Sequence, residues 1–338
     1  MPKLQRVLAC QGLAGGRVAR EHGWHAPRAP RASVRMRRWC APIWMALCLS
    51  VQGAFAAAPA HPPLPHLPFY VATRGTQTIY LLGTLHVGDP VDYPAYQPFR
   101  TPILDALTVS SILAFELSPD DIVASQGRVN QYGVCRSDCL PKMLPPALWD
   151  KLAYRLRGNP VALDEIKKMR PWLAALLIET FSSLSAGLQT EYGTEAQLEN
   201  IYLRAPLVGL ETLDQEMRAF TTLTRAEHWE MLAQDLRQTP EQDVADVRTL
   251  HALWLAGDAD KIAEWQANKE AQLAFSQPLS DAIDKKILYR RNRHFVARMI
   301  AIAPAQHPIF VAIGALHLGG PHGVLAILRQ DGFAVRPA

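Results

Sequence analysis

Two stretches from opposite ends of the chain share one pattern. Residues 78–86 read TIYLLGTLH, and residues 308–317 read PIFVAIGALH. Each is a short apolar run, rich in β-branched and aromatic residues, that ends at a Gly three residues before a His. Such runs are typical of buried strands, and open α/β sheets bind their ligands at the carboxyl ends of their strands. We therefore expect His86 and His317 to face one site built from both ends of the chain.

The remaining segments predict strands near both ends of the chain and helices between them. A β-hairpin is expected from residues 69–73 and 76–82, and residues 172–188, the most apolar internal segment, are expected to form a core helix. Further strands are expected at 111–116, 206–210, 309–313 and 333–335, and further helices at 93–107, at 322–330 and over most of 119–203 and 214–302. This order predicts an α/β fold: a single domain with a central mixed sheet that joins both ends of the chain and a long helical middle.

Charge is unevenly distributed along the chain. The 338 residues are 49% hydrophobic, which is enough for a large core. Residues 1–56 contain nine of the 35 Lys and Arg but only one of the 31 Asp and Glu, so the rest of the chain has a net charge of about −4. No basic patch with interleaved aromatic residues follows residue 56. We therefore expect no nucleic-acid partner.

The first 58 residues resemble a leader rather than part of a core. Residues 1–35 are rich in Arg, Ala, Gly and Pro and are expected to be an unfolded upstream extension. Residues 36–58 combine an Arg pair, an apolar run and an Ala-rich end, which predicts a signal peptide cleaved after Ala56 or Ala58. An uncleaved membrane anchor is the alternative, although the apolar run is short for a membrane span.

Export would determine the compartment and the state of the cysteines. A Pro-rich tether, residues 59–68, is expected before a folded domain of residues 69–338. We expect a periplasmic or secreted protein with no transmembrane segment after signal cleavage. Beyond the leader only Cys135 and Cys139 remain, which in an oxidising compartment predicts a small disulfide loop. A metal-binding pair is the alternative, but no second Cys pair exists to complete a structural zinc site.

Three expected strands end in residues that bind metals. His86, Glu116 and His317 together offer two imidazoles and a carboxylate, a sufficient first shell for a divalent metal ion. An ion held in this way polarises carbonyls and lowers the pKa of a bound water, which is the basis of metal-assisted hydrolysis. Without a metal the same residues could act as general base and acid, and packing or capping roles are the plain alternative. We expect the three side chains to converge within a few ångströms.

Arg291 and Asn292 are further candidates from a predicted helix over residues 280–302. At 100° per residue, Asn292 falls within the apolar face and Arg291 at its edge, while Arg290 and Arg293 face away. A polar side chain on a buried face needs a partner, and the site could provide it. The alternative for Asn292 is the capping of a buried loop.

Four secondary candidates have weaker grounds: Tyr192, Glu195, Glu211 and His322. Glu195 and Glu211 each stand where a helix is expected to begin, so they could simply complement a helix N-terminus, and His322 is expected to cap the last helix. The sequence context predicts surface positions for His228, His251, His294 and His307, and turn-permitting roles for Gly83, Gly88, Gly314 and Gly319.

From about Phe69 to Arg336, the chain resembles the TraB/GumN family, which includes the TIKI proteases and the PrgY-type pheromone-shutdown proteins. The resemblance rests on the two Gly-x-x-His motifs, on FEL at residues 115–117 and on the motifs KKMRPW (167–172), YGTE (192–195), GLET (209–212) and VAIGALHLGGPHG (311–323). It implies a fold similar to erythromycin-esterase and ChaN-like proteins, with His86, Glu116 and His317 in the active site. The TIKI members are regarded as metal-dependent proteases. At Glu195 many relatives carry Asp, which keeps the charge and shortens the reach.

Together these features predict an exported metal-dependent hydrolase that acts on a peptide or envelope-derived substrate. Manganese, cobalt and zinc are the candidate ions, and Arg291 or Asn292 would orient substrate or stabilise an oxyanion. One alternative is a protein that binds haem or another small ligand in the same pocket, as the resemblance to ChaN-like proteins allows. The other is a non-catalytic accessory factor for envelope or exopolysaccharide assembly.

Overall fold

The computed structural model describes residues 63–124, 127–204 and 206–338. The expected upstream extension, the signal peptide and the first residues of the tether lie outside these ranges. Residues 64–338 form one compact unit. Among the described residues, no helix has both the length and the apolarity that a membrane span requires.

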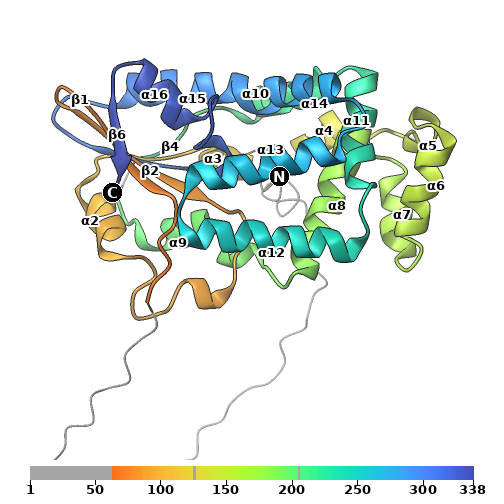
Figure 1. Cartoon of the computed structure of the whole chain (residues 1–338), viewed down its shortest axis with the longest axis horizontal. Coiled ribbons are helices and arrows are strands. Elements are labelled where there is room, and N and C mark those ends of the chain that lie inside the picture. Colours follow the sequence, from red (N-terminus) through yellow and green to blue (C-terminus); the bar gives the residue numbers. More distant parts are fainter. Residues whose placement is uncertain (1–62, 125–126, 205) are drawn as a thin grey trace, which may run out of the picture. The chain divides into compact units, whose positions relative to one another are not determined.

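The described strands form one mixed sheet in the order β4-β3-β5-β2-β1-β6 (Figure 1). Strands β2, β5, β3 and β4 run parallel, and β1 is antiparallel to both of its neighbours, β2 and β6. Their bounds are β1 Phe69–Arg74, β2 Gln77–Thr84, β3 Leu113–Phe115, β4 Leu207–Gly209, β5 Ile309–Gly314 and β6 Ala334–Pro337. The predicted α/β fold, with a sheet that unites both ends of the chain, is therefore confirmed.

The register of the sheet brings the two histidine motifs together. In the parallel pair β2 and β5, Thr84 lies opposite Gly314, and Phe115 of β3 lies opposite Ala312 of β5. The carboxyl ends of β2, β5 and β3 therefore meet at one edge of the sheet, the edge at which α/β proteins bind ligands.

Helices cover both faces of the sheet and extend beyond its carboxyl edge (Figure 1). The helices are α2 Thr101–Val109, α3 Pro119–Ala124, α4 Arg128–Gly133, α5 Leu140–Met143, α6 Pro146–Arg155, α7 Pro160–Ile166, α8 Pro171–Ser185, α9 Thr194–Ile201, α10 Leu213–Thr221, α11 Arg225–Asp235, α12 Pro240–Ala256, α13 Ala259–Leu273, α14 Gln277–Asp284, α15 Arg290–Ile302 and α16 Val324–Gln330. The short helical turns are η2 Pro90–Asp92, η3 Thr190–Tyr192, η4 Lys285–Tyr289 and η5 Ala315–His317.

Each face of the sheet has its own core because alternate strand residues point to opposite sides. Leu81 and Val311 pack with Phe295 of α15 and Leu325 of α16. On the other face, the core consists of residues from β2, β5, α2, α9 and α12, namely Leu82, Phe310, Ile103, Leu198 and Trp254. A third core surrounds α8, in which residues 172–178 are all buried. The prediction of a core helix at this position is confirmed.

The prediction of a helix over residues 93–107 is wrong in its first half. Residues 93–100 instead form a loop, and helix α2 begins only at Thr101. Pro94 and Pro98 explain the difference, since each removes a backbone donor and keeps the preceding residue out of helical geometry. Pro102 is tolerated because it stands in the first turn of α2.

The glycines after the two histidines do not act as left-handed turn residues. Neither Gly88 nor Gly319 has a positive φ. A Cβ on Gly88 would lie 2.2 Å from the carbonyl oxygen of Tyr192, and one on Gly319 would lie 2.0 Å from that of Ala259. At both positions the absence of a side chain allows a close approach of two backbone segments.

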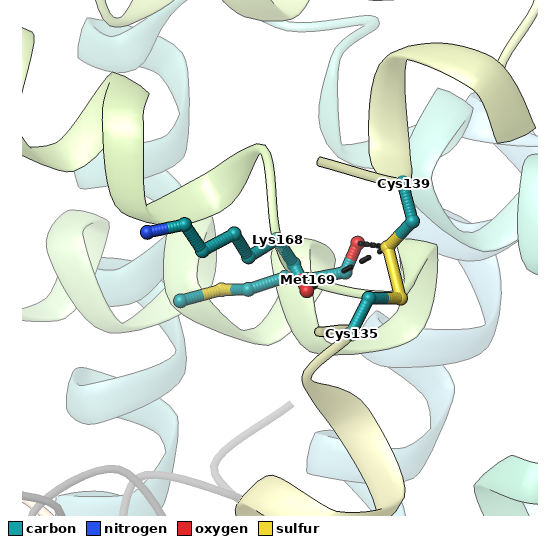
Figure 2. Close-up of a disulfide and its surroundings, with 4 residues drawn as sticks. All are labelled: Cys135, Cys139, Lys168 and Met169. Atoms are coloured by element: carbon teal, nitrogen blue, oxygen red, sulfur yellow. Dashed lines mark hydrogen bonds between the residues drawn. A yellow bond between two sulfur atoms is a disulfide. The ribbon is translucent and has the colours of Figure 1, made fainter. Parts of the chain in front are cut away.

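Cys135 and Cys139 lie at disulfide distance, with 2.16 Å between the sulfur atoms. Figure 2 shows the pair docked against Lys168 and Met169, whose carbonyl oxygens lie 3.6 and 3.5 Å from Sγ of Cys139. The backbone N–H of Cys135 also donates to the Lys168 carbonyl at 2.7 Å. The small loop therefore holds the segment that leads into α8.

Replacing both cysteines with serine is expected to lower the free energy of unfolding by about 2 kcal/mol, the loop-closure term for a loop of about five residues. Urea denaturation of the oxidised protein, the reduced protein and the Cys135→Ser/Cys139→Ser variant measures this. Equal stability of all three forms would show that the bond contributes nothing.

Candidate functional site

His86 follows the end of β2 by two residues and is fixed from one side by Glu195. Nδ1 of His86 lies 2.8 Å from Oε1 of Glu195, and the Thr84 hydroxyl donates to the same oxygen at 2.7 Å. Nδ1 of His86 makes no hydrogen bond of standard geometry, so the first contact is a close approach of the ring to the carboxylate. Nε2 of His86 is buried and has no hydrogen-bond partner among the described residues. The carboxylate favours the proton on Nδ1, which leaves the Nε2 lone pair facing the site.

His317 has an equivalent arrangement on the neighbouring strand. Its Nδ1 contacts Oδ1 of Asn292, and because an amide oxygen only accepts, the histidine N–H donates. Its Nε2 lies 3.5 Å from Oε1 of Glu116. Asn292 also donates from Nδ2 to the carbonyl of His322 at 2.8 Å. Both expected roles of Asn292 are therefore combined, since it contacts a site histidine and holds a loop.

Glu116 lies just beyond β3, the strand that borders β5 on the side opposite β2. Its Oε1 accepts the backbone N–H of Gly314 at 2.8 Å, and its Oε2 accepts from Arg291 at 2.8 Å. Burial raises the pKa of this carboxyl, but the charges of His317, Arg291 and His86 outweigh burial and hold it at about 2. Glu116 is therefore ionised at neutral pH.

Arg291 joins three buried carboxylates. Besides Glu116, it donates from Nε to Glu211 at 2.9 Å, and its Nη2 lies 3.6 Å from Glu216. Burial lowers the pKa of the guanidinium, but the three carboxylates outweigh burial and raise it. Burial raises the pKa of Glu211 despite its bonds to Arg291. The charge of one guanidinium thus compensates the charges of several buried carboxylates. The burial of each kind of group depends on the presence of the other.

A π-helical turn lies immediately before Arg291 and Asn292. Helices α14 and α15 are joined through η4, which is π-helical, and such turns are frequent at functional sites. Arg291 and Asn292 are buried, whereas Arg290 and Arg293 are exposed. The predicted orientation of this helix is confirmed.

The secondary candidates divide into two groups. Glu195 and Glu211 contact site residues, whereas Tyr192 approaches the site only through its backbone beside Gly88. His322 is exposed, with its ring 4.3 Å from that of Tyr289. Its predicted capping role is wrong, because α16 has Gly323 at its N-cap and no side-chain cap.

Two site residues were not predicted, Thr84 and Glu216. Thr84 lies inside the first Gly-x-x-His motif, and Glu216 lies five residues after Glu211, so their spacing to predicted residues was the available signal.

Two histidines expected at the surface are instead buried or half-buried. His228 is buried, and its Nε2 donates to the carbonyl of Phe220 at 3.1 Å; burial lowers its pKa. Nε2 of His251 lies 2.7 Å from Asp92. Both predictions of surface positions were wrong, and for His251 the partner is distant in sequence. His294 and His307 are exposed, as predicted.

The donor set suits a divalent metal ion in its chemistry. Each histidine turns Nδ1 to an outer oxygen acceptor, the arrangement that orients metal-binding imidazoles. The 3.5 Å between Nε2 of His317 and Oε1 of Glu116 is close to the roughly 3.4 Å that separates two ligands of one tetrahedral ion. Among the described residues, however, the three side chains whose ligand atoms all lie within 4.8 Å of one another are Glu116, Glu211 and Glu216. Arg291 already contacts all three of these carboxylates. His86 would therefore have to move closer to Glu116 and His317 to complete a metal site of two histidines and one glutamate.

Stability should fall in acid because of Glu116. Its folded pKa of about 2 lies below the ordinary value of 4.5, so its contribution is present above pH 4.5 and is lost as the pH falls towards 2. This contribution to the free energy of unfolding is about 3 kcal/mol. Urea denaturation between pH 7 and pH 2 measures this. Glu116→Gln should flatten the fall, while Glu165→Gln, at an exposed position, should leave it unchanged. An unchanged profile in Glu116→Gln would refute the assignment.

Two histidines and several carboxylates thus lie at the carboxyl edge of the parallel strands, the edge at which α/β proteins bind ligands. The model of the TraB/PrgY/gumN family matches residues 68–337. The chain therefore belongs to this family, as the sequence motifs predicted. No curated protein and no solved structure matches the chain significantly.

Proposed function

We propose that the protein is a metal-dependent hydrolase that acts on a peptide or envelope-derived substrate outside the cytoplasm. The observation that carries the proposal is the shared orientation of His86 and His317. Each presents Nδ1 to an outer acceptor, and Nε2 of His317 lies beside the ionised Glu116. Two imidazole nitrogens and a carboxylate leave coordination positions open for water and substrate, as catalytic metal sites do.

His86, Glu116 and His317 would hold the ion, which when bound polarises a carbonyl and lowers the pKa of a water. Glu195 and Asn292 fix the two imidazole rings. Arg291 keeps Glu116 charged and in place. Because its guanidinium is buried among carboxylates, we assign Arg291 a positioning role rather than a contact with substrate. Burial raises the pKa of Glu211, whereas the pKa of Glu116 is lowered, so Glu211 holds a proton more readily than Glu116.

Export is supported by the leader pattern of residues 36–58 and by the cysteine pair at disulfide distance. Both are typical of proteins that work in an oxidising compartment. N-terminal sequencing of periplasmic material tests this part separately, since an intact residue 36–58 segment would contradict cleavage.

The function is tested by metal analysis of the purified protein and by a peptide-library cleavage assay with manganese, cobalt or zinc. About one divalent ion per chain, and cleavage that a chelator abolishes, would support the proposal. No retained ion and no metal-stimulated cleavage would contradict it. A haem absorption band without cleavage would instead favour the ligand-binding alternative.

A further inference from the structure

A cavity lies directly beside His86, on the side of the helical middle. Its volume is about 100 Å³, and Leu85 and Val87, the two sequence neighbours of His86, form part of its wall. Side chains of α8, α12 and α13 form most of the rest. Helices α12 and α13 run side by side along this part of the molecule (Figure 1). The cavity therefore adjoins the segment of chain that carries His86.

The charged residues of the cavity lining are mainly acidic. They include Glu179, Asp235, Asp243 and Asp246, with Lys269 as the one Lys or Arg among the lining residues. Two of the acids already have basic partners: Asp246 pairs with Lys269 at 2.8 Å, and Asp243 pairs with Arg155. Their charges are therefore balanced within the protein.

Among the described residues, the carboxylate of Asp235, at the end of α11, has no such ion pair. The residue is only 9% exposed, and its Oδ2 is buried without a hydrogen-bond partner among the described residues. Arg155 approaches but donates to the Asp235 backbone carbonyl, at 2.8 Å, and not to the carboxylate. Burial raises the pKa of Asp235 well above its usual value, the charge of Glu179 adds to this, and the charge of Arg155 opposes it. A buried carboxyl in this state gains most from a cation that arrives from outside.

The other walls suit a cation on an alkyl stem. Ile178, Leu250 and the half-buried Trp265 also line the cavity. Lysine and arginine bury their methylene groups against such apolar surfaces, and an aromatic face attracts the charged end. An acidic end group with apolar walls therefore matches the form of a basic side chain.

We propose that this cavity binds the basic side chain of a peptide, arginine or lysine, with Asp235 as its charge partner. The inference rests on the proposed function in naming the peptide as substrate, and it assigns a preference for basic residues next to the site of cleavage. Selection works through charge, because an uncharged side chain of the same shape would leave the buried Asp235 carboxylate without a compensating positive charge.

The test compares Nα-acetyl-arginine amide with Nα-acetyl-citrulline amide, which keeps the shape and removes the charge. Calorimetric titration should give at least 10-fold tighter binding of the arginine compound to the wild-type protein. Asp235→Asn should reduce this ratio to about one, whereas Asp150→Asn, an equal charge change at an exposed position on α6, should keep it. Equal binding of the two compounds to the wild type would overturn the proposal without any variant, and so would an undiminished ratio in a folded Asp235→Asn.

Two further experiments distinguish this inference from the metal proposal and from the binding of other cations. His86→Ala should keep the arginine-to-citrulline ratio even where it loses the ion, so failure of the metal proposal leaves the cavity proposal testable. Spermidine serves as a free polyamine probe. If it binds more tightly than both arginine and lysine amides, the cavity is a polyamine site and the peptide assignment is overturned.

Discussion

Replacing Arg291 with methionine is expected to lower the free energy of unfolding by about 3–5 kcal/mol at pH 7. The guanidinium contacts Glu116, Glu211 and Glu216, all of them buried. Removing one partner of a buried ion pair leaves the opposite charges without compensation, and that loss is large even where the pair itself contributes little net stability. Urea denaturation monitored by circular dichroism measures the change.

Arg290 provides a matched control, since it is the neighbouring residue on the same helix and is exposed. Arg290→Met should change the free energy of unfolding by no more than about 0.5 kcal/mol. The deficit of Arg291→Met should also shrink as the pH falls, because protonation removes the charges that Arg291 balances. Equal, small effects of the two substitutions at pH 7 would show that the carboxylates do not depend on Arg291.

The sheet could be predicted because its signals are local. The runs at 78–86 and 308–317 are apolar on both faces, as central parallel strands require, and each ends at a glycine before its histidine. Once the two strands pair in parallel, as Thr84 and Gly314 do, the position of both histidines follows. The main residues of the candidate site were thus accessible from the sequence.

The remaining features depend on contacts between distant segments. The position of the His251 ring is fixed by Asp92, which lies 159 residues away in the sequence. No local sequence pattern indicates such a partner. Glu216 stands in an ordinary amphipathic helix start, where an acid normally complements the helix N-terminus. Its approach to Arg291 depends on the packing of α10 against the π-helical turn η4, which sequence periodicity does not specify.

His86→Ala is expected to abolish metal-dependent cleavage and to weaken metal affinity by at least about 100-fold. The substitution removes the imidazole whose Nε2 faces the site and leaves Glu195 with its bond from Thr84. Loss of an outer partner typically costs 10–100-fold in metal affinity, and loss of a ligand itself should cost more. Glu195→Gln should therefore fall between wild type and His86→Ala, because it weakens the orientation of the ring and keeps the ring itself.

The fold should survive this change, because the ring of His86 makes few polar contacts and the strand before it is held by sheet pairing. A metal titration paired with a melting curve separates the two effects, and His307→Ala, at an exposed position, should leave both unchanged. If His86→Ala unfolds the protein while the metal content of its folded fraction stays at the wild-type level, the paired motifs serve packing. The ion would then have to bind elsewhere, for which the cluster of Glu116, Glu211 and Glu216 is the alternative position. In that case Glu216→Gln, which leaves both histidines in place, should remove the ion that His86→Ala retains.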